Sequence, residues 1–289
     1  IIWLSPVYKS PFVDQGYDIA DYYAIAEEFG TMDEFDELLA EAKKRDMHII
    51  MDLVINHCSD QHVWFRKALA DPDGKYADYF YFRKGKNGNP PSNYRSYFGG
   101  SCWEPVPGTD KYYFHMFAKE QPDLNWENTT LRQKLYDMIN WWTEQGAGGY
   151  RFDAIESIAK IPEAGIVEEG PMLHEYVKEL SAAALQGKDL VTVGEAWSAN
   201  IERAKRWSNP DGSELSMVFQ FQHIIQDEIP GGNKWDRRPL HLPDLKRVIG
   251  AWQRGLRGCG WNSLFWENHD LPRIVSRWGN DREYREASA

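Results

Sequence analysis

Cysteine is scarce in this chain and forms no ordered pattern. The 289 residues include three cysteines, Cys58, Cys102 and Cys259, with no Cys-x-x-Cys pair and no metal-ligand spacing. A scattered, odd-numbered set gives no readable disulfide framework of the kind that small secreted domains use. We therefore expect a cytoplasmic protein. The chain opens in an apolar segment without an initiating methionine, so an upstream signal peptide stays open as an alternative.

Long apolar runs and an excess of basic residues are also lacking. No stretch of the sequence approaches the roughly 18 apolar residues that a membrane span needs. Lys and Arg number 33 against 44 Asp and Glu, which gives a formal charge of −11. Because nucleic-acid affinity comes largely from clustered Lys and Arg, we expect neither a nucleic-acid partner nor a membrane partner.

Histidine patterns typical of metal sites are missing as well. The eight histidines contain no His-x-His and no His-Glu-x-x-His arrangement. This disfavours a metal-dependent barrel hydrolase, the rival class of enzyme, and we expect no metal ligands in this chain. Apolar residues, by contrast, make up 42% of the chain and aromatic residues 14%, which is enough to build a core. The many Trp and Tyr rings can also stack on sugar faces.

Strand and helix patterns alternate along most of the chain. Capping-box spacing at Thr31 and Glu34 predicts a helix over 31–46, and the apolar run 48–55 predicts a parallel strand buried on both faces. The other predicted elements are helices at 131–146, 171–186 and 243–254 and strands at 1–4, 149–153, 189–195, 215–221 and 261–266. This alternation predicts an α/β fold, a (β/α)8 TIM barrel from which two strands are missing.

One segment breaks this rhythm. Residues 58–128 are rich in Gly, Pro, Asn and aromatic residues. Because a structureless loop of this length is improbable in a compact domain, we predict a small inserted subdomain. It would separate a first barrel part, 1–57, from the continuation of the barrel, 129–289.

Polar side chains collect where the predicted strands end. They are Asn56, His57, Arg151, Asp153, Glu195, His269 and Asp270. Each alone has an ordinary structural explanation, such as a helix cap, a rim charge or a buried histidine. Because the carboxyl ends of parallel barrel strands open on one face, their recurrence on successive strands favours a single site.

The carboxylates in this set suit carbohydrate chemistry. Hydrolysis of a glycoside needs one protonated carboxyl and one ionised carboxyl. Arg151 lies two residues before Asp153 on one face of a strand, so we expect its charge to lower the pKa of Asp153 and hold it ionised. Glu195 follows the apolar residues 191–194, and dry surroundings favour the neutral form that a proton donor needs.

Five ordered segments carry a family resemblance. Segments 52–57, 149–153, 194–197 and 268–270 resemble the four signature segments of the α-amylase superfamily, glycoside hydrolase family 13. Segment 121–126, Gln-Pro-Asp-Leu-Asn-Trp, is similar to a further segment typical of the oligo-1,6-glucosidase branch. Within that branch, 214–221 and 268–273 look most like glucan 1,6-α-glucosidases, also called dextran glucosidases. In this family the inserted subdomain, called domain B, follows the third barrel strand.

The resemblance implies a role for individual residues. It makes Asp153 the nucleophile, Glu195 the general acid/base and Asp270 the carboxylate that stabilises the oxocarbenium-like transition state. It also implies that Tyr17 stacks under the non-reducing glucose and that Asp18 bonds the far hydroxyls of that glucose. The remaining implied substrate-binding residues are His57, Arg151, Ala154, His269 and Arg273.

The same resemblance implies a reaction. A closed pocket and a covalent intermediate give a retaining, exo-acting α-glucosidase that cleaves α-1,6 bonds of isomalto-oligosaccharides or dextran. Ala154 stands where α-1,6-specific relatives usually have Val, so an α-1,4-glucosidase, a trehalose-6-phosphate hydrolase and a sucrose isomerase stay open. A non-catalytic barrel relative is a distant alternative that the three carboxylates disfavour. No cofactor is expected to be required; calcium is possible, but the family's acidic calcium loop would lie upstream of this chain. The closing strand and the C-terminal β domain would also lie outside it.

Overall fold

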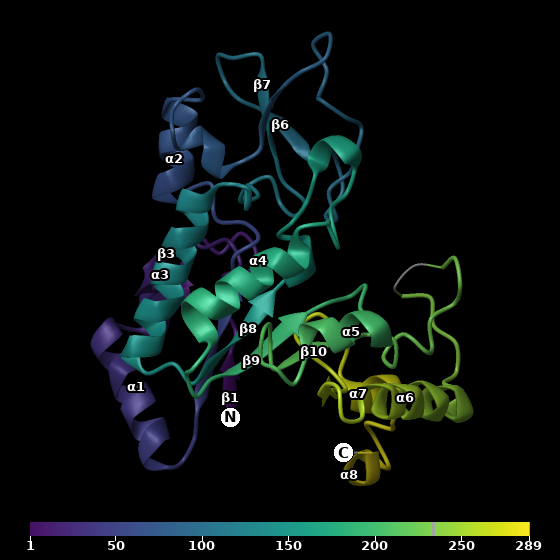
Figure 1. The fold of residues 1–289 in the computed structure, drawn as a ribbon. Helices are drawn as coiled ribbons and strands as arrows, with labels where there is room; N and C mark the ends of the chain where they lie inside the picture. Colours follow the sequence, from purple (N-terminus) through teal and green to yellow (C-terminus); the bar gives the residue numbers. More distant parts are fainter. Residues whose placement is uncertain (233–234, 289) are drawn as a thin grey trace.

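A parallel sheet forms the centre of the fold in the computed structural model, which describes residues 1–232 and 235–288. Its strands, in spatial order, are β1 (Ile2–Leu4), β4 (Ile49–Val54), β8 (Gly149–Asp153), β9 (Val191–Glu195), β10 (Met217–Phe219) and β11 (Asn262–Ser263) (Figure 1). Each neighbouring pair is parallel. Strands that follow one another in chain order confirm the predicted α/β barrel architecture.

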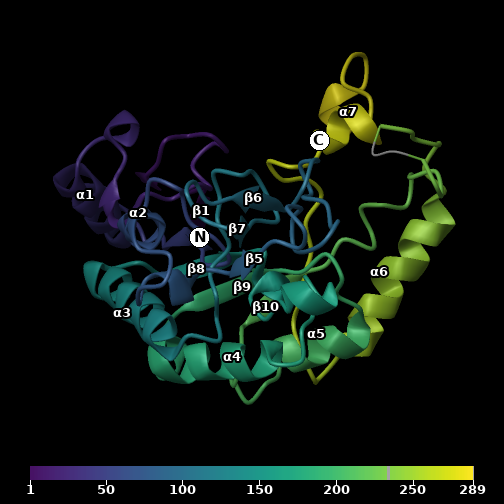
Figure 2. The same cartoon turned by 90° about the horizontal axis from the view of Figure 1, so that it is seen from above.

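Helices cover the outer face of this sheet. They are α1 (Met32–Lys44), α3 (Thr129–Gln145), α4 (Leu173–Leu180), which a π-helical turn (Ser181–Leu185) extends, α5 (Ile201–Trp207) and α6 (Leu242–Leu256). Figure 2 shows these helices as an arc around the strands. The predicted helices at 31–46, 131–146, 171–186 and 243–254 are confirmed by α1, α3, α4 and α6.

Local sequence sets the ends of the long helices. The Thr31 hydroxyl accepts a hydrogen bond from the Glu34 N–H at 3.3 Å, and the Glu34 carboxylate accepts one from the Thr31 N–H at 2.8 Å. This capping box starts α1, as predicted. At the end of α3, Gly146 adopts a φ of 112°, a left-handed conformation that favours glycine.

Several short elements carry no clear sequence pattern. They are the hairpin of β2 (Tyr8–Lys9) and β3 (Asp21–Ile25), and the helices α2 (Val63–Ala70), α7 (Ile274–Arg277) and α8 (Arg285–Ser288). The predicted strand at 261–266 is wrong in length, because β11 pairs over only Asn262 and Ser263. Trp261 and Leu264 beside it are largely exposed, so no buried face extends the pairing.

Residues between β4 and α3 build a second, smaller sheet. It is antiparallel, with strand order β5 (Phe82–Lys84), β7 (Lys111–Phe114), β6 (Trp103–Pro105). It has a small core of its own, which includes Cys102, Trp103, Phe114 and Met116. In Figure 1 this sheet stands above the carboxyl ends of the barrel strands. The proposed boundaries at 58 and 128 stay a prediction.

No helix in residues 1–232 and 235–288 combines the length and the apolar character needed to cross a membrane.

A buried histidine joins the start of α2 to the aromatic core. His62 is the N-cap of α2, and its Nδ1 accepts a hydrogen bond from the Trp64 N–H at 3.1 Å. Its ring packs against Trp64 and Tyr22, with centroids 4.4 and 5.4 Å away. Burial lowers the pKa of His62 to about 4, so the ring is neutral at pH 7.

This depressed pKa predicts an acid-dependent loss of stability. A folded-state pKa of about 4 against about 6.5 in the unfolded chain stabilises the fold above pH 6.5, and this stability is lost as the pH falls through 4. In His62→Asn, the amide oxygen keeps the N-cap but does not titrate. Between pH 7 and pH 4 the wild-type free energy of unfolding should fall by about 3 kcal/mol more than that of the variant. Urea unfolding at both pH values measures this difference, and parallel pH profiles would contradict the assignment.

Candidate active site

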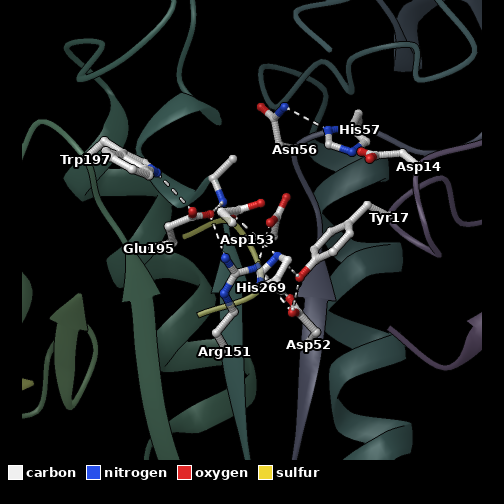
Figure 3. Close-up of polar contacts among 12 residues, drawn as sticks. Asp14, Tyr17, Asp52, Asn56, His57, Arg151, Asp153, Glu195, Trp197 and His269 are labelled. Atoms are coloured by element: carbon white, nitrogen blue, oxygen red, sulfur yellow. Dashed lines mark hydrogen bonds and ion pairs between the residues drawn. The ribbon is translucent and has the colours of Figure 1, made fainter. Parts of the chain in front are cut away.

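A cavity of about 530 Å³ opens at the carboxyl ends of the barrel strands. Most of the predicted site residues line it: Tyr17, His57, Asp153, Ala154, Glu195, His269 and Asp270. Figure 3 shows several of their side chains pointing into a common space from β4, β8, β9 and the neighbouring loops. The carboxyl ends of the strands and the loops that follow them therefore bring together residues more than 250 positions apart in the chain, such as Tyr17 and His269.

A single guanidinium lies at the base of this cavity. Arg151 is 1% exposed, and its Nη1 donates to Asp52 Oδ1 at 2.9 Å and to Asp153 Oδ1 at 2.6 Å. Its Nη2 pairs with Glu195 Oε2 at 2.8 Å. We call these four residues the Arg151 cluster. The strand register explains it in part, because Asp52 on β4 pairs directly with Arg151 on β8.

The expected low pKa of Asp153 is wrong. Burial raises the pKa of Asp153 well above its ordinary value, and the charges of Glu195 and Asp52 raise it further, while Arg151 opposes the change. Burial also raises the pKa of Asp52 against the same guanidinium. The sequence pointed to one carboxylate for one Arg, whereas three carboxylates share it. For both Asp52 and Asp153, burial and the neighbouring carboxylates therefore outweigh the guanidinium.

Glu195 receives donors from three directions. Besides Arg151, its Oε2 accepts a hydrogen bond from the Ala154 N–H at 3.1 Å. Its Oε1 accepts one from Trp197 Nε1 at 3.0 Å. These contacts fix both carboxylate oxygens at the edge of the cavity.

Tyr17 and His269 form one wall. The Tyr17 hydroxyl donates to Asp52 Oδ2 at 2.9 Å, and its ring stacks on His269 with centroids 5.3 Å apart and planes at 9°. Burial, reinforced by the Asp52 charge, raises the pKa of Tyr17, so the hydroxyl keeps its proton. Asp270 lines the cavity with half of its side chain exposed, and its Oδ2 lies 3.4 Å from His269 Nε2.

Of two acidic residues after the first strand, the structure places Asp14, and not Asp18, in the cavity wall. Asp18 is fully buried, and its carboxylate accepts the backbone N–H groups of Val13 and Asp14, each at 3.0 Å. It therefore braces a loop and is absent from the cavity lining, and its implied bonds to the far hydroxyls of the glucose stay a prediction. Asp14 lines the cavity instead, with Gln121 Nε2 donating to its Oδ2 at 3.0 Å. The sequence holds no signal that separates the two residues.

Arg273 also lies away from the cavity lining. Its Nη1 pairs with Glu267 Oε1 at 2.6 Å, and its side chain is 84% exposed. The Glu267 carboxylate also accepts the backbone N–H of Ile274 at 2.6 Å. In this structure Arg273 thus stabilises the start of α7.

A buried polar chain supports the opposite wall. His57 lies between two side-chain amides, with Nδ1 3.1 Å from Asn56 Nδ2 and Nε2 3.1 Å from Gln121 Nε2. Burial lowers the pKa of His57 to about 4, which keeps it neutral. Lys160, which the sequence reading missed, donates to Asn56 Oδ1 at 2.6 Å and pairs with Asp123 Oδ2 at 2.9 Å.

Metal ligands do not gather in the part of the chain that the structure describes: no group of three or more His, Cys, Asp or Glu side chains there is arranged to hold an ion. The calcium loop expected upstream of this chain stays a prediction.

Comparisons with known proteins agree with this geometry. A family model described as the alpha amylase catalytic domain matches residues 1–289. The chain is 55% identical to a glucan 1,6-alpha-glucosidase of Streptococcus pneumoniae, over all of this chain and 53% of that protein. It is 48% identical to an oligo-1,6-glucosidase of Halalkalibacterium halodurans, over all of this chain and 54% of that protein. The chain therefore spans about half the length of the curated relatives it matches.

Solved structures show the same likeness. The crystal structure of Bacillus licheniformis trehalose-6-phosphate hydrolase matches with a TM-score of 0.92 at 43% identity, over 98% of this chain and 53% of that chain. A trehalulose synthase from Pseudomonas mesoacidophila matches with a TM-score of 0.91 at 40% identity, over 97% of this chain and 52% of that chain.

The Lys160–Asp123 pair gives a stability prediction. Lys160→Met leaves the Asp123 carboxylate buried without its cation, and we expect a loss of about 3 to 5 kcal/mol in the free energy of unfolding. Adding Asp123→Asn removes that charge and keeps an acceptor for the Met116 N–H, so the double variant should recover part of the loss. Urea unfolding of the three proteins tests this, and a double variant less stable than Lys160→Met would refute it.

Proposed function

This chain belongs to the α-amylase family, and we propose that the protein containing it is a retaining, exo-acting α-glucosidase. It would hydrolyse α-1,6 bonds at the non-reducing end of isomalto-oligosaccharides or dextran. One observation carries the proposal: a single buried guanidinium holds the carboxyls of Asp153 and Glu195 side by side at the base of a cavity. The names of the relatives that match over the whole chain support the α-1,6 linkage.

In the proposed mechanism the two carboxyls have different tasks. Asp153 attacks the anomeric carbon in its ionised form, which the Arg151 guanidinium stabilises against the effect of burial, and forms a glycosyl ester. Glu195 donates a proton to the leaving oxygen. Glu195 then takes a proton from water, and the resulting attack releases glucose with its α configuration retained. Retention requires two carboxyls about 5 to 5.5 Å apart, and in this site both carboxyls are paired with nitrogens of one guanidinium.

The surroundings support a neutral oligosaccharide as the substrate. Tyr97, Phe98, Phe117 and Trp197 line the cavity and offer flat faces for sugar rings. Asp14 and Asp270 present carboxylates that can accept hydrogen bonds from hydroxyl groups. We further propose that the protein works in the cytoplasm without a nucleic-acid partner or a cofactor, which its three unpaired cysteines and its charge of −11 support.

The lining disfavours a sugar phosphate. Among the described residues of the cavity wall, Arg237 is the one Lys or Arg side chain. It is already paired with Asp227 Oδ1 at 3.2 Å and Glu228 Oε1 at 3.0 Å. A trehalose-6-phosphate hydrolase would need free cationic groups to bind the phosphate. The α-1,4-glucosidase is therefore the stronger alternative. The small side chain of Ala154 also supports it, because it leaves the space beside the scissile bond wide.

Substrate assays of the full-length protein test the proposal. We expect isomaltose and dextran to be hydrolysed with higher kcat/KM than maltose, sucrose or trehalose 6-phosphate. Asp153→Asn should lower turnover by several orders of magnitude without loss of folding, because it removes the group that forms the glycosyl ester. Near-normal activity of that variant, with deamidation excluded, would refute the nucleophile. A strong preference of the wild type for maltose would establish the α-1,4 alternative.

Ala154 gives a separate prediction on linkage. Ala154→Val adds two methyl groups, worth about 1 to 2 kcal/mol where desolvated, and should raise the isomaltose-to-maltose ratio of kcat/KM about five- to thirtyfold. Ala154 has φ 43° and ψ 37°, so the β-branched side chain should also lower the free energy of unfolding by about 1 to 3 kcal/mol.

Ala154→Gly is the matched control for both effects. It relieves the left-handed backbone and removes the methyl group, so the linkage ratio should not rise. If Ala154→Val leaves the ratio of kcat/KM unchanged, this residue does not set the linkage.

A further inference from the structure

We infer that Glu156 is a positioning residue for Glu195 and acts on it through Trp197. The inference rests on the proposed function and deepens it, because it concerns how the proton donor is held. Glu156 lines the cavity, but its side chain bonds neither the Arg151 cluster nor a reacting atom in the proposed mechanism. It contacts instead the turn that follows Glu195 in the chain.

Glu156 lies in a 3-10 turn (Ile155–Ser157) directly after β8 and is 3% exposed. Its Oε1 accepts the backbone N–H of Trp197 at 2.9 Å. Its Oε2 accepts the Ser198 N–H at 3.1 Å and the Ser198 hydroxyl at 2.7 Å. The two carboxyl oxygens accept three donors, whereas the single amide oxygen of Gln has lone pairs for two, so Glu156 ties the turn after β9 to the end of β8.

Trp197 passes this constraint to the proton donor. Its ring stacks on Phe221, with centroids 3.6 Å apart and planes at 8°. Its backbone is held by Glu156, so both ends of the residue are fixed. The indole N–H then points at Glu195 Oε1, as Figure 3 shows, at a distance of 3.0 Å.

The contact between Trp197 and Glu195 Oε1 matters because the other carboxyl oxygen, Oε2, has different donors. Glu195 Oε2 already accepts from Arg151 and from the Ala154 N–H, and Trp197 is the donor to Oε1. A proton donor must keep its carboxyl aligned with the leaving oxygen, and an indole N–H stabilises the carboxylate that remains after the proton has left. Loss of this alignment by about 1 Å can lower a rate about a hundredfold.

The cost of burying Glu156 supports a functional role. Burial raises its pKa to about 7, and the charges of Glu168 and Glu169 add to this effect, while the Ser198 contacts oppose it. Arg203 lies on this side, with its Nε 3.5 Å from Glu169 Oε2. A carboxyl is therefore kept buried beside other acidic groups, where the donors of the 197–198 turn stabilise it.

Kinetics with two leaving groups separate a role in positioning Glu195 from a role in stabilising the fold alone. In the full-length protein, Glu156→Gln should lower kcat/KM on isomaltose about ten- to a hundredfold and on 4-nitrophenyl α-glucoside less than about threefold. The aryl group departs with little protonation, so it does not depend on an aligned acid. Glu214→Gln is the matched control, because Glu214 is also buried and is bonded to His174 at 2.8 Å, away from the cavity. It should change both substrates equally.

A double-mutant cycle tests whether Glu156 acts on Glu195 through Trp197. Trp197→Phe keeps a ring on Phe221 but removes the indole N–H, and it should show the same selective loss as Glu156→Gln. Combined, the two changes should have no larger effect than Trp197→Phe alone. Additive losses, or equal losses on both substrates, would overturn the inference.

A crystal structure of Glu156→Gln gives a readout that does not depend on activity. The contact between Trp197 Nε1 and Glu195 Oε1 should be broken or lengthened, and its retention would overturn the inference. If the wild type hydrolyses no α-glucoside, the proposed function fails. If the wild type is active and the variant leaves the ratio between the two substrates unchanged, only the positioning role fails.

Discussion

The buried guanidinium of Arg151 is the interaction on which the rest of the site depends. Three carboxylates from β4, β8 and β9 end beside it, and without its charge they would repel one another in a dry environment. The parallel register brings Asp52 opposite Arg151 and carries Glu195 to the end of the next strand. Formation of the sheet and assembly of the charged cluster are therefore one event, because the cluster exists only when neighbouring strands are paired in this register.

Sequence patterns predicted the fold where elements are long and failed where they are short. The helix α1 has a capping box, and the buried apolar run of β4 is continuous, so the local sequence predicts each of these elements. The helix α5 and the strand β11 do not, because seven residues give too few turns for an apolar period and two residues give no alternation. Such elements are set by the neighbours they pack against, which a single sequence does not display.

The candidate site shows the same division. Barrel topology placed Asp153, Glu195 and His269 correctly around one cavity, because strand ends converge whatever the loops do. The choice between Asp14 and Asp18 depends on which carboxylate a loop turns inward, and that follows from two backbone hydrogen bonds absent from any motif. The direction of the Asp153 pKa needed the sum of burial and two neighbouring charges, whereas the sequence offered only the nearby Arg.

The imbalance of charge at the cluster itself has a chemical consequence. One guanidinium does not neutralise three carboxylates, and the neutral His57 adds no second cation to the cavity. A site with balanced charges would have no electrostatic preference for a sugar that becomes positive. Here the surplus negative charge, in surroundings of low dielectric constant, would favour the oxocarbenium-like transition state of the proposed reaction over the neutral substrate. Burial and the same surplus raise the pKa values of Asp52 and Asp153, so the charge that favours the cation is itself costly to keep in the folded site.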